Sequence, residues 1–287
     1  MNFMDYHKLS LNDPILQEVI KNPHWLGLSE SEFQNKNPQQ RAELIVGEYF
    51  LQLSRKTGEI ASQLLLKAQW GYQEPEWFDH RHHLLNLDRF FGDYWAIPAS
   101  DVVACLPWGG SLLELCSGDG FYPYYFYRTR AKEIICVEFD KEVYNHAKRC
   151  HSSPNIDYIL QSVLEYEPNP NYFDVVSIRG AIEHFNEDEQ ILIFEKAYQA
   201  LKSRGWFCGD TPAANPNPSQ KHLSHHEHEY KDEYELKQQL EKVFEVVHTY
   251  KVVSKDRVNL FWKCQKNLNT GQSSDKAPKI SENHTIF

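Results

Sequence analysis

The spacing of apolar residues changes near residue 106 and divides the chain into two parts. Before this point, apolar residues between 41 and 67 recur near helical spacing, and Gly58 is expected to break or bend that helix. After it, short apolar runs alternate with amphipathic stretches, which is typical of a parallel sheet covered by helices. We therefore expect a helical part over 1–105, a sheet domain over 106–266 and a polar, disordered tail over 267–287.

The sheet domain contains seven apolar runs that we interpret as strands. They span residues 111–116, 133–139, 155–160, 172–178, 205–209, 244–253 and 257–266. Asp140 and Asn186 are expected N-caps of helices over 141–150 and 187–203, and 121–130 is long enough for a helix of about three turns. The last two runs are close enough to form a hairpin. The predicted fold class is α/β, with a Rossmann-like, seven-stranded, mostly parallel sheet, an antiparallel last strand and an N-terminal helical cap.

The first apolar run ends in a turn of small and acidic residues, with the sequence SLLELCSGDGF over 111–121. Gly118 and Gly120 would let the backbone approach a ligand closely, and Glu114 stands just before the turn. A strand, a glycine turn and a helix place a binding site at the carboxyl end of the strand. The sequence therefore predicts a ligand site beside residues 114–120.

Composition narrows the function classes. The chain has 30 Lys and Arg against 40 Asp and Glu, for a net charge of −10, which disfavours generic binding to nucleic acid. Its six cysteines include no C-x-x-C pair, so we interpret them as reduced thiols and not as a zinc ribbon. No signal-peptide segment opens the chain and no stretch is apolar enough to span a bilayer, so we expect a cytoplasmic protein.

Four motifs, in this order, resemble those of class I S-adenosylmethionine-dependent methyltransferases of the ubiquinone-biosynthesis-like branch. They are ELCSGDG at 114–120, VEFD at 137–140, FDVVSIRGAIEHF at 173–185 and LKSRGWFCGDTP at 201–212. The resemblance covers about 106–266 and implies S-adenosyl-L-methionine as cofactor. The chain departs from the family pattern at Cys116, where the family has its first glycine, and at 161–163, where the family has an acidic residue.

The resemblance also implies residue roles. Glu138 would hold the ribose hydroxyls, although a helix-capping or exposed acid at a strand end is the structural alternative. Phe139 would offer an apolar face to adenine, and Glu114 would meet the methionine end. Ser162 and the backbone amide of Val163 would bond the adenine edge. The other expected cofactor-binding residues are Cys116, Gly118, Gly120 and Arg179.

Residues that follow the fourth and fifth strands are the candidates for chemistry. Methyl transfer to oxygen needs alignment and usually a base, which His184 or a histidine of HLSHHEHEY (222–230) would supply. Alternatively, Glu183, His184 and His228 would bind a divalent metal, as in the similar small-RNA terminal-ribose methyltransferases. Gly180 stands where those enzymes have a glutamate, so we assign no metal. A third interpretation is that Glu183 and His184 only position the loop and the helix start.

We expect a methyltransferase that acts on a small molecule or a glycan, with oxygen favoured over nitrogen as acceptor. The aromatic stretch 69–95 would be a substrate lid or a cover for the core, and aromatic faces suit sugars and rings. The alternatives are a metal-assisted RNA ribose methyltransferase and a non-catalytic cofactor-binding protein. A Rossmann dehydrogenase is weaker, because residues 116–120 lack the third glycine of the dinucleotide fingerprint.

Overall fold

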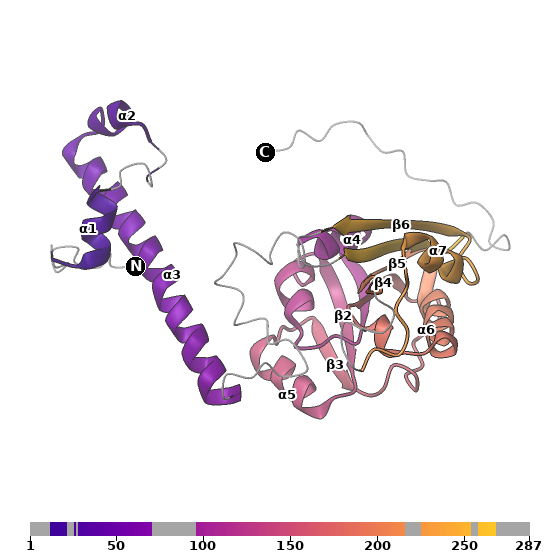
Figure 1. Ribbon diagram of the computed structural model, residues 1–287. Helices are drawn as coiled ribbons and strands as arrows, with labels where there is room; N and C mark the ends of the chain where they lie inside the picture. Colours follow the sequence, from indigo (N-terminus) through magenta and orange to yellow (C-terminus); the bar gives the residue numbers. More distant parts are fainter. Residues whose placement is uncertain are drawn as a thin grey trace. The chain divides into compact units, whose positions relative to one another are not determined.

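The computed structural model describes residues 12–21, 26, 28–70, 96–215, 225–253 and 258–267. The chain divides into two compact units, Met1–Phe90 and Phe91–Phe287 (Figure 1). Residues 71–95 of the expected aromatic lid, His222 and residues 268–287 of the expected tail lie outside the described residues. No helix in the described ranges is both long enough and apolar enough to cross a membrane.

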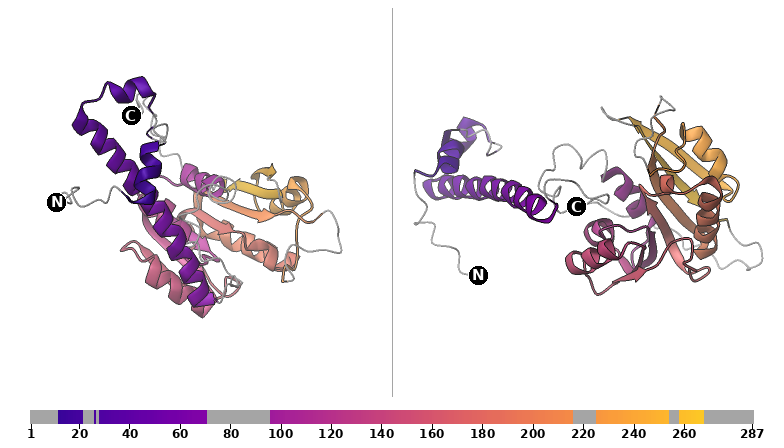
Figure 2. Two further views of the ribbon diagram at one scale, coloured as in Figure 1. Left: turned by 60° about the vertical axis from the view of Figure 1, so that its left-hand side comes forward. Right: turned by 60° about the horizontal axis from the view of Figure 1, so that its bottom comes forward.

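The N-terminal unit is built from three helices. They are α1 (Pro14–Lys21), α2 (Glu30–Gln34) and α3 (Pro38–Trp70). α1 packs against α3 and buries Leu16 and Val19. The expected break at Gly58 was wrong, because α3 is a helix along its full 33 residues (Figure 2). A single helical glycine costs only about 1 kcal/mol relative to alanine, which good helix formers on both sides offset.

The second unit is organised around a seven-stranded sheet with the strand order β3-β2-β1-β4-β5-β7-β6. The strands are β1 (Gly110–Leu115), β2 (Ala131–Glu138), β3 (Ile156–Leu160), β4 (Phe173–Arg179), β5 (Leu201–Pro212), β6 (Val246–Val253) and β7 (Val258–Gln265). β1 to β5 pair in parallel, whereas β7 is antiparallel to both of its neighbours. The predicted Rossmann-like sheet with an antiparallel last strand is confirmed.

Helices cover both faces of this sheet. They are α4 (Ile97–Cys105), η5 (Pro123–Tyr127), α5 (Lys141–Cys150), η6 (Ile182–His184), α6 (Glu187–Ala200) and α7 (Glu233–Leu240). Figure 1 shows α6 and α7 along one face, and α4 and α5 along the other. Both expected N-caps are present: Asp140 accepts from two backbone N–H groups of α5, and Asn186 forms a capping box with Glu189.

Two segments differ from the sequence-based expectation. In addition, α4 was expected in the helical part over 1–105 and lies in the second unit. The stretch after β1 forms the five-residue π-helix η5, in which the backbone N–H of Arg128 donates to the carbonyl of Pro123. The expected three-turn helix over 121–130 is not completed, because residues 128–130 form a turn before β2 begins at Ala131. α6 ends at Ala200 because Leu201 enters the core and pairs with Phe173. α4 lies in the sheet unit, where it contacts β4 and β5.

The alternation of side chains along β1 separates an apolar face from a polar one. Leu113 and Leu115 join the main hydrophobic core with residues of α6 and α7. Because successive side chains of a strand point to opposite faces, Glu114 lies on the other face. Its register partner on β4 is Ser177, which is also fully buried. Polar groups therefore enter the sheet unit on the face away from α6.

Candidate active site

The turn after β1 has three residues in the left-handed backbone region. Their φ angles are 53° for Cys116, 55° for Gly118 and 75° for Gly120. Such an angle costs a non-glycine residue about 1–2 kcal/mol, so Cys116 is strained where the resembling family has glycine. Burial, together with nearby carboxylates, raises the pKa of the Cys116 thiol, which therefore stays protonated. A Cβ at Gly118 would meet no atom within 4 Å.

Gly120 is required for packing, and this gives a stability prediction. A Cβ there would lie 2.1 Å from the hydroxyl oxygen of Tyr158. We expect Gly120→Ala to lower the free energy of unfolding by about 2 kcal/mol or more. Gly118→Ala, the control with the same backbone strain but open space, should cost about 1 kcal/mol. Urea denaturation measures both, and Tyr158→Phe should recover part of the Gly120→Ala loss. Equal losses for the two glycines would contradict the steric explanation.

The carboxylate of Glu138, at the end of β2, is directed at the β1 turn. Its Oε2 accepts from the backbone N–H of Gly118 at 3.0 Å, and its Oε1 accepts from Asp140 at 2.9 Å. Burial raises the pKa of Glu138, and these backbone bonds oppose that shift. The next side chain, Phe139, is 72% exposed. An acid and an exposed apolar ring thus stand next to each other at the carboxyl end of β2.

Two further predicted cofactor-binding residues follow β3. The Ser162 Oγ accepts from the backbone N–H of Leu164 at 3.3 Å, and the Ser162 carbonyl accepts from Glu165 and Tyr166. The Val163 side chain is buried in the main core. The backbone N–H of Gln161 donates to the carbonyl of Glu138, which fixes this segment beside the end of β2.

Glu114, Arg179 and Asp210 form a buried charged cluster across β1, β4 and β5. Arg179 Nη2 lies 3.0 Å from Asp210 Oδ1, and the guanidinium carbon lies 3.7 Å from the centroid of the Tyr122 ring. Burial raises the pKa of Glu114 to about 7, although Arg179 opposes the shift. Among the described residues, Glu114 Oε2 and the Nε and Nη1 groups of Arg179 have no hydrogen-bond partner. The cluster therefore has unused donors and an unused acceptor.

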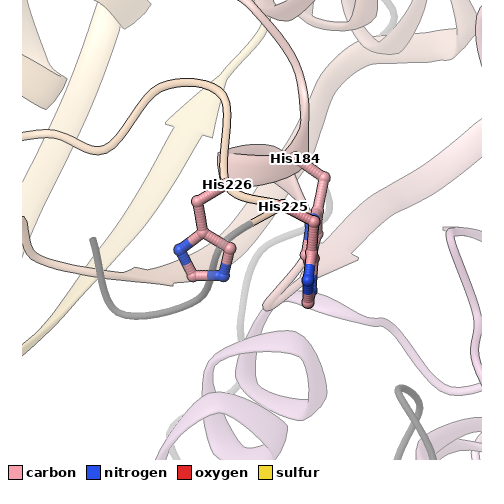
Figure 3. Close-up of side chains that lie close together, drawn as sticks. All are labelled: His184, His225 and His226. Atoms are coloured by element: carbon pink, nitrogen blue, oxygen red, sulfur yellow. The ribbon is translucent and has the colours of Figure 1, made fainter. Parts of the chain in front are cut away.

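Glu183 and His184 belong to the short helix η6, which begins at Ile182, shortly after β4 ends at Arg179. The Glu183 carboxylate accepts from the Thr211 hydroxyl at 2.9 Å, and the Glu183 carbonyl accepts from the backbone of Glu227 and His228. The His184 ring is stacked on His225, with centroids 4.7 Å apart and planes at 7° (Figure 3). Burial and then the neighbouring His226 and His225 lower the pKa of His184 to about 4.

The structure groups the histidines differently from the set considered from sequence. His184 lies with His225 and His226, whereas His228 packs on Tyr230 and its Nδ1 is 3.5 Å from Glu187. His225 and His226 are not distinguished by sequence from the other loop histidines, and no motif indicated a role for Asp210, Tyr122 or Thr211. A sequence signal existed for Asp210, because it directly follows the strand expected over 205–209, and the structure pairs it with Arg179.

Comparison with known proteins agrees with this geometry. Residues 112–205 match the family model of a methyltransferase domain. No curated protein matches the chain. Among solved structures, Haemonchus contortus phosphoethanolamine N-methyltransferase 2, in complex with S-adenosyl-L-methionine, matches with a TM-score of 0.54 and 14% identity over 72% of this chain and 60% of its own.

Two further structures match over nearly their whole length. A chain from the complex between the Haloferax volcanii Trm112 methyltransferase activator and its methyltransferase gives a TM-score of 0.53 and 11% identity, over 64% of this chain and 93% of its own. The Bacillus subtilis YcgJ protein gives a TM-score of 0.51 and 12% identity, over 61% of this chain and 100% of its own. At these identities, the structural matches establish the fold.

Proposed function

We propose that this chain, which carries a class I S-adenosylmethionine-dependent methyltransferase domain, methylates a hydroxyl group of a small molecule or a glycan. The observation that carries the proposal is the pair of buried acids on either side of the β1 turn. Glu138 stands at the end of β2, and Glu114 lies within β1 beside Arg179 and Asp210. A nucleoside at one end of a ligand and an amino acid at the other would match this arrangement.

Glu138 is the proposed ribose ligand. Each of its carboxylate oxygens accepts one backbone N–H, and a carboxylate has about four acceptor positions, so capacity for two hydroxyl donors remains. The exposed ring of Phe139 would cover one face of adenine. The backbone of Ser162 and Val163, which follows the bond from Gln161 to the Glu138 carbonyl, would meet the ring edge. Gly118 supports this placement because no side chain fills the space in front of its Cα.

The charged cluster is the proposed site for the methionine end. Glu114 would pair with the ammonium group, and the unused Arg179 N–H groups would bind the carboxylate. With Glu114 ionised, two carboxylates face one guanidinium, so the cluster has an excess negative charge. S-adenosylmethionine carries more positive than negative charge, which this excess complements. Cys116 and Gly120 complete the turn that would let the sulfonium approach the backbone.

His184 is the proposed catalytic residue. S-adenosylmethionine, held by the residues described above, would supply an electrophilic methyl group, and an acceptor oxygen would bond to that carbon with S-adenosylhomocysteine as the leaving group. The acceptor must lose its proton, and His184 is neutral near pH 7, so its ring offers a lone pair at this edge. Glu183 and His228 act as positioning residues, because the Glu183 carbonyl holds the backbone of the histidine loop.

The function is tested by product formation. Full-length protein is titrated calorimetrically with S-adenosylmethionine and with NAD, then incubated with panels of hydroxylated and amine acceptors while S-adenosylhomocysteine release is measured. We expect binding of S-adenosylmethionine alone and turnover with hydroxylated acceptors. Turnover with amines only would overturn the proposed acceptor class, and binding of NAD alone would overturn the cofactor.

Loss of the His184 ring should separate chemistry from cofactor binding. We expect His184→Ala to lower kcat about 100-fold, as for removal of a group that handles the acceptor proton. The dissociation constant for S-adenosylmethionine should stay unchanged, because the cofactor contacts proposed above do not include His184. His248→Ala, an exposed histidine on β6, is the control and should have wild-type kcat. An unchanged kcat in His184→Ala would contradict the role.

A further inference from the structure

Three histidines from two distant segments of the chain converge beside η6. One nitrogen from each of His184, His225 and His226 lies within 4.8 Å of the other two. Figure 3 shows the His184 and His225 rings side by side, with one nitrogen of His226 directed toward them. We propose that these three imidazoles bind a divalent transition metal ion, and this set differs from the Glu183, His184 and His228 set considered from sequence.

The two segments are held together by their backbones, so the convergence does not depend on the histidines themselves. The N–H groups of Glu227 and His228 donate to the Glu183 carbonyl at 2.8 and 3.2 Å. The side-chain amide of buried Gln190 donates to the carbonyls of Ile182, at 2.9 Å, and His228, at 3.3 Å. A ligand set on a rigid support loses little conformational entropy when it binds an ion.

The hydrogen bond of His226 to Glu229 involves Nδ1, and Figure 3 shows the other ring nitrogen directed toward His184 and His225. His226 Nδ1 lies 2.5 Å from Glu229 Oε1, and both side chains are largely buried. A carboxylate on one ring nitrogen fixes the orientation of the ring and leaves Nε2 as the metal ligand, the arrangement found behind most metal-binding histidines. Glu229 would therefore be the supporting acid of this site.

The donor set selects the class of metal. Three imidazoles and no carboxylate suit zinc, nickel, copper or iron in preference to magnesium or calcium, which take oxygen ligands. Zinc–nitrogen bonds of about 2.1 Å place tetrahedral ligands about 3.4 Å apart, so the nitrogens must approach by up to about 1.4 Å and the His225 ring must turn out of its stack on His184. His225 is exposed, which leaves its ring room to make this movement. Three protein ligands also leave a fourth position open.

An open position gives the ion a role in the reaction, and this part of the inference rests on the proposed function. An acceptor hydroxyl bound there would ionise more readily, because a coordinated divalent ion lowers the pKa of an oxygen ligand. His184 would then act on the acceptor through the metal and not as a base, and the acceptor proton would leave to solvent. Zinc binding itself requires neither cofactor nor acceptor, so its measurement fails or succeeds independently of the methyltransferase assay.

The test is calorimetric titration of chelator-treated, full-length protein with Zn²⁺, repeated with Co²⁺ to record the visible absorption of a tetrahedral site. We expect one tight site, weakened at least about 100-fold in His184→Ala, His225→Ala and His226→Ala, and about 10-fold in Glu229→Gln. His248→Ala is the matched control and should bind as wild type, and His228→Ala distinguishes this site from the set considered from sequence. Circular dichroism confirms folding, and His225→Ala, an exposed position, keeps the test valid if a buried variant unfolds.

Three results would overturn the inference. Zinc binding that is unchanged in all three histidine variants would place the ion elsewhere, as an adventitious ion only. Loss of binding in His228→Ala but not in His225→Ala would favour the set considered from sequence. A spectrum of octahedral Co²⁺ with no change in His225→Ala would exclude a site built from these imidazoles.

Discussion

Glu138→Ala is expected to weaken binding of S-adenosylmethionine by about 100-fold or more. A carboxylate that accepts from two ribose hydroxyls makes two charge-assisted hydrogen bonds, each worth about 1.5–2 kcal/mol, and their loss corresponds to at least that change in affinity. The side chain is 6% exposed and already directed at the turn, so the bonds form in a largely dry environment. Isothermal titration calorimetry with the full chain measures the effect.

In Glu138→Ala, damage to the fold must be distinguished from loss of ligand recognition, because the Glu138 carboxylate also accepts from the backbone N–H groups of Gly118 and Asp140. Glu138→Gln keeps the shape and one acceptor oxygen, and should retain the fold while losing most of the affinity. Glu142→Ala removes an exposed acid from the first turn of α5 and should bind normally. Normal binding by Glu138→Ala together with a lower melting temperature would reduce Glu138 to a structural role.

The sheet could be predicted because its strands are signalled locally. Apolar runs such as 133–139 and caps such as Asp140 each act over a few residues, and their alternation leaves few topologies. The ends of elements were predicted less well. Leu201 leaves α6 for the sheet because pairing with Phe173 and burial outweigh helix propensity, and neither contact is visible in the local sequence.

The candidate site was predictable only where one motif contains it. Gly118, Gly120 and Glu138 belong to motifs with fixed spacing, and the structure brings them together. The histidine cluster depends on contacts between distant segments. The sequence shows several histidines near 225, but their placement beside His184 depends on backbone contacts of the loop with Gln190 and with the Glu183 carbonyl. Likewise, the ion pair between Arg179 and Asp210 follows from strand order, which no single motif encodes.

Binding of S-adenosylmethionine is expected to depend on pH through Glu114. Burial raises the pKa of this carboxyl to about 7, whereas pairing with an ammonium group requires the ionised form. The dissociation constant should therefore rise about tenfold for each pH unit below about 7 and level off above 8. Calorimetry at pH 6.5 in buffers of different ionisation enthalpy should show release of a proton on binding. Absence of proton release would contradict an ammonium partner at Glu114.

Glu114→Gln should change binding and stability in opposite directions. The pKa of Glu114 is higher in the folded chain than the ordinary 4.5, so its stabilising contribution is complete below pH 4.5 and is lost as the pH rises to about 7. That loss is about 3 kcal/mol for a shift of this size. Glutamine carries no charge, so the variant should be more stable than wild type by up to this amount at pH 8 and similarly stable at pH 4.5. Its affinity for S-adenosylmethionine should be lower than that of wild type at pH 8 and should not vary with pH. Thermal unfolding at the two pH values, with calorimetry on the same samples, measures both effects. A residue that only holds the fold would not show higher stability together with weaker ligand binding when its charge is removed. Observing both effects would therefore identify Glu114 as a binding residue that lowers the stability of the free protein.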